Sequence, residues 1–427
     1  MSLPKLLFFS ALLLVLSYAC DSVNVHAMPT AATPVSNNTI TLPITKHFNF
    51  TGSAGKILQH DQARIRALHA RGIASATGTA PPLTPDVGNI PIENALATYN
   101  VINHYVRHAS QDLLIVDSGS ANTWVGAEKP FVHTSTTREL PNSMSVVYGN
   151  GAWMSGMEYE DTVVLGSGMT VPGQYFGVAS STYHFEGFDG VLGLGPGDLT
   201  IGTLSPDKTS LILTVTDNLY FQDIISSYVL SISFEPPIDG PVVNGELTFG
   251  GTDPTKFVRE ILFAPITTAS PSSSYFGVDQ GVRYGFETLL SNNPGIFDTG
   301  TSLILLAADA FNNYISLAGA EYDSVTTLYR ITPEGYENLQ SLFFTINGVE
   351  FDFIPNAQIW PVRPDVEHNR GSNEYVYLII GNLGTISGSG MDVVLGMMFI
   401  ERFYTVFDLE NRQVGLAATP FTGSITN

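Results

Sequence analysis

Short apolar runs separated by glycine-bearing turns make up most of this 427-residue chain. The runs are rich in Val, Ile, Tyr, Phe and Thr, and their length and composition are typical of β-strands. We expect strands at residues 99–102, 145–148, 228–234, 246–249, 375–380, 404–408 and 413–417. The pattern therefore predicts a mostly β fold.

Helical signals are few and short. Thr332 is suited to an N-cap and Pro333 to the first helical position, so a helix is predicted over residues 334–342. Helices are also predicted over residues 217–225 and 309–317. Helices are therefore expected to be minor elements beside the strands.

The first 90 residues follow a different pattern. Residues 39–46 predict a short edge-type strand, because Pro43 removes one donor from the ladder. Residues 56–71 predict a helix that Gly72 ends. Its apolar side chains lie close to one face, and its three arginines are available for solvent or for an acidic partner: Ile57, Leu58, Ile65 and Leu68, with Arg64, Arg66 and Arg71. The Ala-, Thr-, Gly- and Pro-rich stretch up to about residue 89 predicts an exposed linker that is open to proteolysis.

The N-terminus carries an apolar run at residues 6–16 that follows a lysine and is too short to span a bilayer. This is typical of a secretory signal peptide, with cleavage after Ala19 or at a later point near Ala27. The single cysteine, Cys20, means that a large core rather than disulfides must hold the fold.

Charge is distributed unevenly along the chain. Residues 1–80 hold six Lys or Arg against two Asp, a net charge of +4. Since the whole chain has a net charge of −21, residues 81–427 carry −25. We interpret the basic leader as a detachable cover for an acidic body, since opposite potentials attract. The acidity argues against nucleic acid as a partner. An acidic surface that serves only solubility is the alternative.

One four-residue pattern occurs twice, as Asp117-Ser118-Gly119-Ser120 and as Asp298-Thr299-Gly300-Thr301. Each copy follows an apolar pair, and each is followed later by an apolar-apolar-Gly signal, at residues 191–193 and 394–396. This duplication predicts two lobes related by an approximate two-fold axis, with Asp117 and Asp298 facing each other. Two carboxyls that meet in this way share one proton. Such a pair can activate a water and polarise a carbonyl oxygen, which is the chemistry of peptide hydrolysis without a covalent intermediate.

With these residues the chain resembles the pepsin-like aspartic peptidases, of the basidiomycete polyporopepsin type. In that family two aspartates are known to share one proton. The resemblance runs from about residue 99 to the C-terminus. It is carried by residues 116–127, 147–151, 187–195, 205–219, 244–250, 298–302, 338–348 and 399–408. It implies a bilobal pepsin-like fold with pseudo-two-fold related lobes and an N-terminal prosegment.

The resemblance also implies roles for individual residues. Asp117 and Asp298 match the catalytic pair, and Ser118 and Thr299 match the hydroxyls that lock the two turns together. Trp124 matches the indole partner of the flap tyrosine. The substrate-binding positions are Gly119, Ser120, Tyr148, Asn150, Gly151, Gly300, Thr301 and Ser302.

The expected organisation is a signal peptide (1–19), a propeptide (20–80), an N-terminal catalytic lobe (81–255) and a C-terminal catalytic lobe (256–427). We expect a secreted, extracellular, monomeric endopeptidase that cleaves polypeptides at acidic pH with a bias toward hydrophobic residues. Its propeptide is expected to act as an intramolecular inhibitor through a basic side chain that the sequence does not identify. We expect no cofactor, no metal, no nucleic acid and no membrane as partners.

Three departures from the family pattern stand out. Ser118 replaces the commoner Thr, a change from which we expect little effect. The flap at residues 151–156 is one residue longer than in relatives, and residues 105–110 replace a Gly- and Pro-containing turn. The flap's return strand and the hairpin before Asp117 are therefore expected to differ from those of relatives.

The same residues argue against other functions. A non-catalytic binding protein on this scaffold would not need both aspartates, both hydroxyls and the flap tyrosine. A glycosidase can also use paired carboxylates, but its chemistry does not need them in twin Asp-Ser/Thr-Gly turns. His104 and His108 have the spacing of helical metal ligands without a third ligand, and residues 190–195 lack the lysine of a nucleotide-binding loop.

Overall fold

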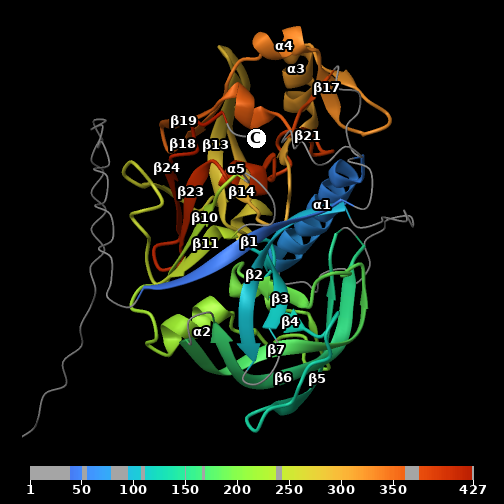
Figure 1. The fold of residues 1–427 in the computed structure, drawn as a ribbon, viewed down its shortest axis with the longest axis vertical. Helices are drawn as coiled ribbons and strands as arrows, with labels where there is room; N and C mark the ends of the chain where they lie inside the picture. Colours follow the sequence, from blue (N-terminus) through green and yellow to red (C-terminus); the bar gives the residue numbers. More distant parts are fainter. Residues whose placement is uncertain are drawn as a thin grey trace, which may run out of the picture. The chain divides into compact units, whose positions relative to one another are not determined.

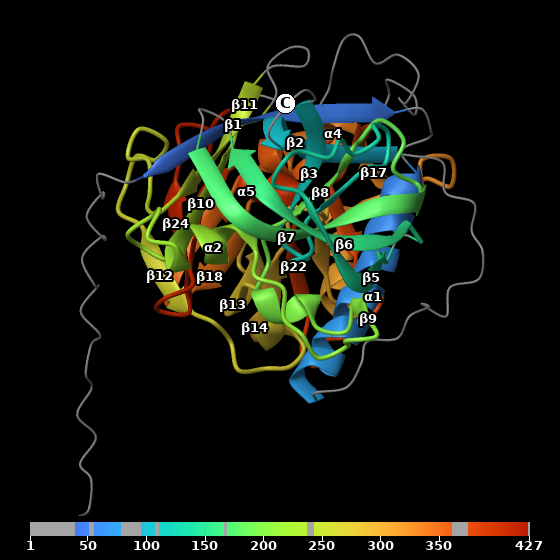
Figure 2. The same cartoon turned by 90° about the horizontal axis from the view of Figure 1, so that it is seen from below.

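The computed structural model describes residues 39–50, 55–77, 95–106, 111–149, 151–165, 169–236, 243–360 and 375–425. The chain divides into a unit of residues 1–32 and a unit of residues 33–427, and all described residues belong to the second. The predicted signal peptide and residues 78–89 of the predicted linker lie outside the described residues. As predicted, strands dominate (Figure 1 and Figure 2).

Fourteen strands of the described chain form one continuous sheet in the order β12-β24-β23-β10-β11-β1-β2-β3-β8-β4-β7-β6-β5-β9. They are β1 (Ile40–Phe50), β2 (Ala95–Val106), β3 (Gln111–Asp117), β4 (Trp124–Val125), β5 (Arg138–Val147), β6 (Trp153–Leu165), β7 (Met169–Tyr183), β8 (Gly190–Gly193), β9 (Leu204–Ser205), β10 (Val229–Phe234), β11 (Val243–Phe249), β12 (Leu262–Pro265), β23 (Phe403–Asp408) and β24 (Gln413–Ala418). Strands from both ends of the chain therefore share this sheet.

A second sheet runs in the order β19-β18-β13-β14-β22-β15-β21, and a small third one in the order β16-β17-β20. Their strands are β13 (Gly277–Tyr284), β14 (Glu287–Phe297), β15 (Ile304–Leu306), β16 (Glu321–Tyr322), β17 (Tyr329–Ile331), β18 (Leu342–Ile346), β19 (Val349–Phe353), β20 (Val376–Tyr377), β21 (Ile380–Asn382) and β22 (Val393–Leu395). The helices are α1 (Gly55–Thr77), α2 (Val215–Phe221), α3 (Ala308–Ala318), α4 (Pro333–Glu337) and α5 (Met397–Ile400), with 3-10 turns η1 (Gly197–Thr200), η2 (Ser272–Ser274) and η3 (Pro355–Gln358).

The duplicated sequence pattern has a duplicated structure. β3, which ends in Asp117, pairs in parallel with β8, and β14, which precedes Asp298, pairs in parallel with β22. In each copy a third strand pairs antiparallel on the other side, β4 beside β8 and β15 beside β22. β8 and β22 are the two apolar-apolar-Gly segments, so each one supports the strand that carries an aspartate.

The leader strand is longer and more central than its sequence suggested. β1 pairs with β11 through Ile40 to Thr45 and with β2 through Ile44 to Phe50, so the predicted edge strand lies inside the sheet. Pro43 is tolerated because only β11 pairs at that position, and the pairing with β2 starts one residue later. Leu42 and Ile44 are fully buried. The leader is thus built into the sheet of the body.

The leader helix is also longer than predicted, and Gly72 does not end it. α1 continues to Thr77, and a Cβ atom at Gly72 would lie 2.6 Å from Cβ of Pro271 and 2.9 Å from the ring of Tyr275. Glycine is therefore required at this point for close packing rather than for a turn. Ile57, Leu58, Ile65 and Leu68 are all buried, as their spacing predicted.

The short helices lie where the sequence predicted helices, but their bounds differ from the predicted ones. α3 lies where a helix was predicted, and Thr332 caps α4 by accepting from the Gly335 amide at 3.0 Å. α4 stops at Glu337 because Leu342 and Phe344 enter β18 and bury there. α2 starts at Val215, two residues early, where Thr214 and Asp217 form a capping box.

We predict that Gly72→Ala destabilises the protein, although alanine normally favours a helix over glycine by roughly 0.5–1 kcal/mol. The added methyl group must displace Pro271 or Tyr275, and overpacking costs roughly 1–3 kcal/mol. The thermal unfolding midpoint should therefore fall. Ser75→Ala, on the exposed side of the same helix, is the control and should not lower it. A higher midpoint for Gly72→Ala would contradict the packing argument.

Candidate functional site

The two predicted carboxylates are held by matching hydrogen bonds within their own turns. Oδ1 of Asp117 accepts from the Gly119 amide at 2.9 Å, and its Oδ2 accepts from the Ser120 hydroxyl at 2.6 Å. Oδ1 of Asp298 accepts from the Gly300 amide at 3.1 Å, and its Oδ2 from the Thr301 hydroxyl at 2.5 Å. Both aspartates are buried. The repeated motif therefore fixes two carboxylates in equivalent positions.

Ser118 and Thr299 tie the two turns to each other. The Ser118 amide donates to Oγ1 of Thr299 at 2.9 Å, and the Thr299 amide donates to Oγ of Ser118 at 3.0 Å. Each hydroxyl also donates across to a main-chain carbonyl, Ser118 to Phe297 at 3.3 Å and Thr299 to Val116 at 2.9 Å. The predicted cross-bonds between hydroxyl and backbone are present in both directions, and serine is sufficient to make them.

One guanidinium from the leader helix fills the space between the carboxylates. Nη2 of Arg64 lies 2.5 Å from Oδ1 of Asp117 and 2.8 Å from Oδ1 of Asp298, while its Nε donates to Oδ2 of Asp298 at 2.7 Å. A Cβ atom at Gly119 or Gly300 would lie within 2.5 Å of Nη2, so both turns need glycine here. A single nitrogen atom thus bridges the two carboxylates.

The charges around Arg64 perturb one another. Burial alone would raise the pKa of the Asp298 carboxyl, but the charge and hydrogen bonds of Arg64, with help from Thr301 and Gly300, lower that pKa below its usual value. Burial likewise opposes the charge on Arg64, and the two aspartates outweigh this effect and raise the pKa of Arg64. At neutral pH the guanidinium is therefore held by charge-assisted bonds in a site closed to water.

The β5–β6 hairpin covers the helix at this point. Its turn is closed by the Tyr148 amide, which donates to the Ala152 carbonyl at 2.8 Å, and Nε1 of Trp124 donates to the Tyr148 hydroxyl at 2.7 Å. A Cβ atom at Gly149 would lie 2.3 Å from Cα of Arg64, so the hairpin rests directly on the helix backbone. Burial, followed by the charge of Asp117, raises the pKa of Tyr148, which keeps the phenol protonated.

The comparison with known sequences agrees with this geometry. The sequence model of the family described as "Eukaryotic aspartyl protease" matches residues 107–419. The chain belongs to the eukaryotic aspartyl proteases. It is 49% identical to polyporopepsin of Irpex lacteus over 341 residues, which cover 80% of this chain and 99% of that protein. It is 31% identical to cathepsin E of Rattus norvegicus over 324 residues, 71% of this chain and 75% of that protein.

The structural comparison extends the match to the fold. The crystal structure of the aspartic proteinase from Irpex lacteus has a TM-score of 0.75 and 42% sequence identity, covering 91% of this chain and 100% of that one. The predicted pepsin-like fold is thereby confirmed. This aspartyl protease is an aspartic-type endopeptidase of the pepsin-like group, and hence a hydrolase.

Most of the residues that meet around Asp117 and Asp298 were predicted from the sequence, but the leader residues that contact them were not. Residues from distant parts of the chain meet as predicted: Asp117, Ser118, Gly119, Ser120, Trp124, Tyr148, Asp298, Thr299, Gly300 and Thr301. Gly151 lies in the hairpin turn with a positive φ of 85°. Asn150 and His108 lie outside the described residues, and for His104 only the backbone, within β2, is described.

Arg64 and Asp61 are the residues that the sequence did not single out. The amide of Ser302, a predicted substrate-binding residue, donates to Asp61 of the leader at 3.1 Å. A signal for both was available, since residues 57, 61, 64, 65 and 68 recur with the spacing of one helix face. Charged side chains on that otherwise apolar face indicate buried partners, whereas Arg66 lies off it and is exposed.

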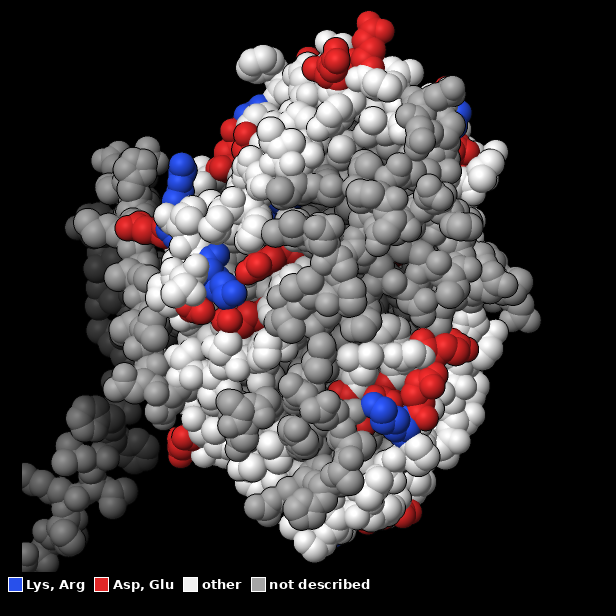
Figure 3. Space-filling view, in the orientation of Figure 1, with Lys and Arg blue, Asp and Glu red and all other residues white. Residues whose placement is uncertain are grey.

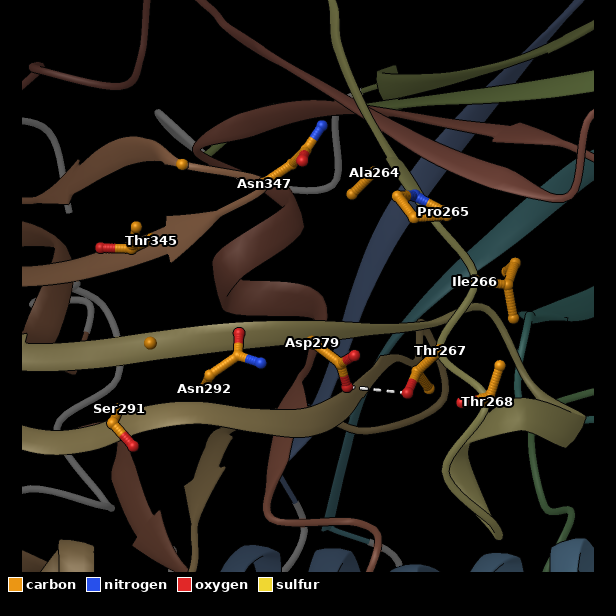
Figure 4. A pocket seen from close by; sticks show the side chains of 12 residues that line it. Ala264, Pro265, Ile266, Thr267, Thr268, Asp279, Ser291, Asn292, Thr345 and Asn347 are labelled. Carbon is orange, nitrogen blue, oxygen red and sulfur yellow. Dashed lines mark hydrogen bonds between the residues drawn. The ribbon is translucent and has the colours of Figure 1, made fainter. Parts of the chain in front are cut away.

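A separate surface hollow of about 450 Å³ includes neither Asp117 nor Asp298 in its lining (Figure 4). Asp279 is the only titratable group among its twelve described lining residues, and it accepts from Thr267 at 2.7 Å. The described lining of the hollow thus has one titratable group, whereas the site described above brings together two carboxylates and a guanidinium.

Among the described residues, no group of three His, Cys, Asp or Glu side chains is arranged to hold a metal, and no helix is long and apolar enough to cross a membrane. Figure 3 shows several groups of Asp and Glu on one face of the aspartyl protease.

We predict that Thr299→Ala destabilises the aspartyl protease by about 3 kcal/mol, because it leaves the buried Ser118 amide and Val116 carbonyl without their partner. Urea unfolding at neutral pH measures the change. Thr299→Ser keeps the hydroxyl and should cost less than about 1 kcal/mol. Equal losses in the two variants would show that the methyl group, not the cross-bond, carries the effect.

Proposed function

We propose that this chain is the precursor of a secreted, monomeric endopeptidase in which Asp117 and Asp298 activate water at acidic pH, with Arg64 blocking them until the leader is removed. The observation that carries this proposal is the bridge that Nη2 of Arg64 makes between the two carboxylates. The endopeptidase class is shared with the relatives; the residue roles, the precursor state, secretion and specificity are proposed.

The geometry supports a general acid–base reaction. Once the leader has left, a water molecule takes the place of the guanidinium nitrogen between the aspartates, which then share one proton. The ionised carboxylate removes a proton from the water as its oxygen attacks the scissile carbonyl, and the protonated carboxyl donates to the carbonyl oxygen. The tetrahedral diol then collapses: the carboxyl that took the proton of the water donates it to the amide nitrogen, one diol hydroxyl returns its proton to the other carboxylate, and the C–N bond breaks to release an acid and an amine.

The surrounding residues are proposed to position the substrate. Tyr148, held by Trp124, closes the flap over the bound peptide with Asn150 and Gly151. Gly119, Ser120, Gly300, Thr301 and Ser302 present main-chain and hydroxyl groups to an extended backbone, while Ser118 and Thr299 keep the two turns in register. Recognition that relies on backbone and on apolar side chains is consistent with broad specificity biased toward hydrophobic residues.

The leader is proposed to respond to pH through the aspartates. Arg64 lowers the pKa of Asp298 in the precursor, so the docked state binds protons less readily than the leader-free state. The corresponding stabilisation is therefore full above the ordinary pKa of the carboxyl and is lost as pH falls through the lowered value. Acid thus releases the leader and exposes Asp117 and Asp298, the dyad, at the acidic pH under which the proposed reaction runs.

We predict that Asp117→Asn and Asp298→Asn each abolish hydrolysis of an added protein substrate at about pH 3 to 4, because amides cannot exchange the shared proton. The family inhibitor pepstatin should abolish the wild-type activity. Asp309→Asn, which alters an exposed carboxylate bonded to Ser387, should keep wild-type activity. Undiminished hydrolysis by either dyad variant would refute the assigned roles.

We predict that the wild-type precursor stays intact at neutral pH and acquires a new N-terminus between residues 71 and 89 on acidification. Arg64→Gln should shift the midpoint of this conversion upward by about one pH unit, because the acid-sensitive ion pairs are gone. Gel analysis and N-terminal sequencing across a pH series measure both. Arg66→Gln removes the same charge from an exposed position and should behave as wild type. A precursor that remains intact in acid would contradict the proposal.

A further inference from the structure

A second charged side chain of the leader helix is buried beside the dyad. Asp61 is fully buried, and its Oδ2 accepts from the Leu303 amide at 2.8 Å and from the Ser302 amide at 3.1 Å. Its Oδ1 lies 3.3 Å from the Ser302 amide and 3.4 Å from Nδ1 of His60. Ser302 and Leu303 directly follow the Asp298–Thr301 turn. The leader therefore engages both the carboxylates and the main chain next to them.

We propose that Asp61 is a second anchor of the leader, and that the amide pair of Ser302 and Leu303 is its binding site. This inference rests on the proposed precursor function and adds a regulatory residue to it. A buried carboxylate is strongly disfavoured unless hydrogen bonds replace its water, and here two main-chain donors do so. Detachment of the helix would break these bonds together with those of Arg64.

The two anchors fix the position of the helix along its axis. Asp61 and Arg64 are three residues apart, so they project from the same face with a rise of about 4.5 Å between them. A slip by one turn, about 5.4 Å, would leave a buried carboxylate and a buried guanidinium without partners. Packing of Leu58 and Leu68 alone resists such a slip less, because apolar contacts are not directional.

The two anchors also fix the direction of the helix. Asp61 needs hydrogen-bond donors, which the amides of Ser302 and Leu303 supply, and Arg64 needs acceptors, which Asp117 and Asp298 supply. A helix laid in the opposite sense would bring the carboxylate of Asp61 toward the dyad, where like charges repel. Opposite charges one turn apart therefore specify a single docked arrangement.

The test uses the full-length precursor at neutral pH and measures the rate at which trypsin cuts the leader. This rate reports how often α1 detaches. Cleavage at Arg66 requires α1 to detach, so its rate follows the population of the open state when opening and closing are fast. Asp61→Asn keeps the shape and removes the charge, and we expect the leader to be cut about tenfold faster than in wild type. Gln59→Ala, at an exposed position on the same helix, is the matched control and should be cut at the wild-type rate.

Two further variants separate the possible outcomes. Arg64→Gln should also accelerate cleavage if the proposed precursor function is right. Acceleration by Arg64→Gln with Asp61→Asn at the wild-type rate would overturn the second anchor and leave the proposed function standing. Wild-type rates in both would overturn both. Asp61→Glu keeps the charge one methylene away from the amides and should fall between wild type and Asp61→Asn; a wild-type rate there would count against the geometry argued above.

Folding is checked with the released enzyme. After acid conversion every leader variant yields the same mature sequence, so equal kcat/KM values on a peptide substrate show that each precursor folded. Should Asp61→Asn fail this check, Asp61→Glu supplies the comparison, and its rate relative to wild type decides the proposal.

Discussion

The contact on which this structure depends is a single guanidinium between two buried carboxylates. Two negative charges in one closed site repel each other strongly, and a proton or a cation must compensate them. Arg64 supplies that cation with three short bonds to Asp117 and Asp298, and the turns need glycine at Gly119 and Gly300 to admit it. The same closeness of the carboxylates therefore creates the proposed reactive pair and the means of blocking it.

Among the interactions that hold α1, the apolar contacts and the ion pairs of Arg64 differ in their dependence on pH. Ile57, Leu58, Ile65 and Leu68 bury apolar surface, each worth on the order of 2 kcal/mol whatever the proton concentration. The ion pairs of Arg64 are different, because protonation of the aspartates would leave a buried charge without a partner, at a cost of roughly 3–5 kcal/mol. In the proposed activation, acid thus turns the ion pairs of Arg64 into a source of instability while the apolar contacts stay unchanged.

The sequence predicted what depends on local chemistry and missed what depends on packing. The Asp-Ser/Thr-Gly turns, the strands that support them and the cap at Thr332 follow from short-range patterns, and they lie where predicted. Gly72 was misjudged because its role comes from Pro271, nearly 200 positions along the chain. Pro43 was misjudged because a strand can be central overall and still lack one neighbour locally. Arg64 could have been distinguished from Arg66 only by its phase on the apolar face of α1.

The bonds that shape the dyad do not involve the leader. Asp117 and Asp298 are each oriented by the amide and hydroxyl of their own turn, and the two turns are joined through Ser118 and Thr299. Departure of α1 removes the bonds of Arg64 and leaves this framework in place. Because a preorganised site needs no rearrangement before it reacts, the leader is best understood as an occupant of a finished site. In the proposed activation, its removal exchanges a cation for water and leaves these hydrogen bonds of the carboxylates in place.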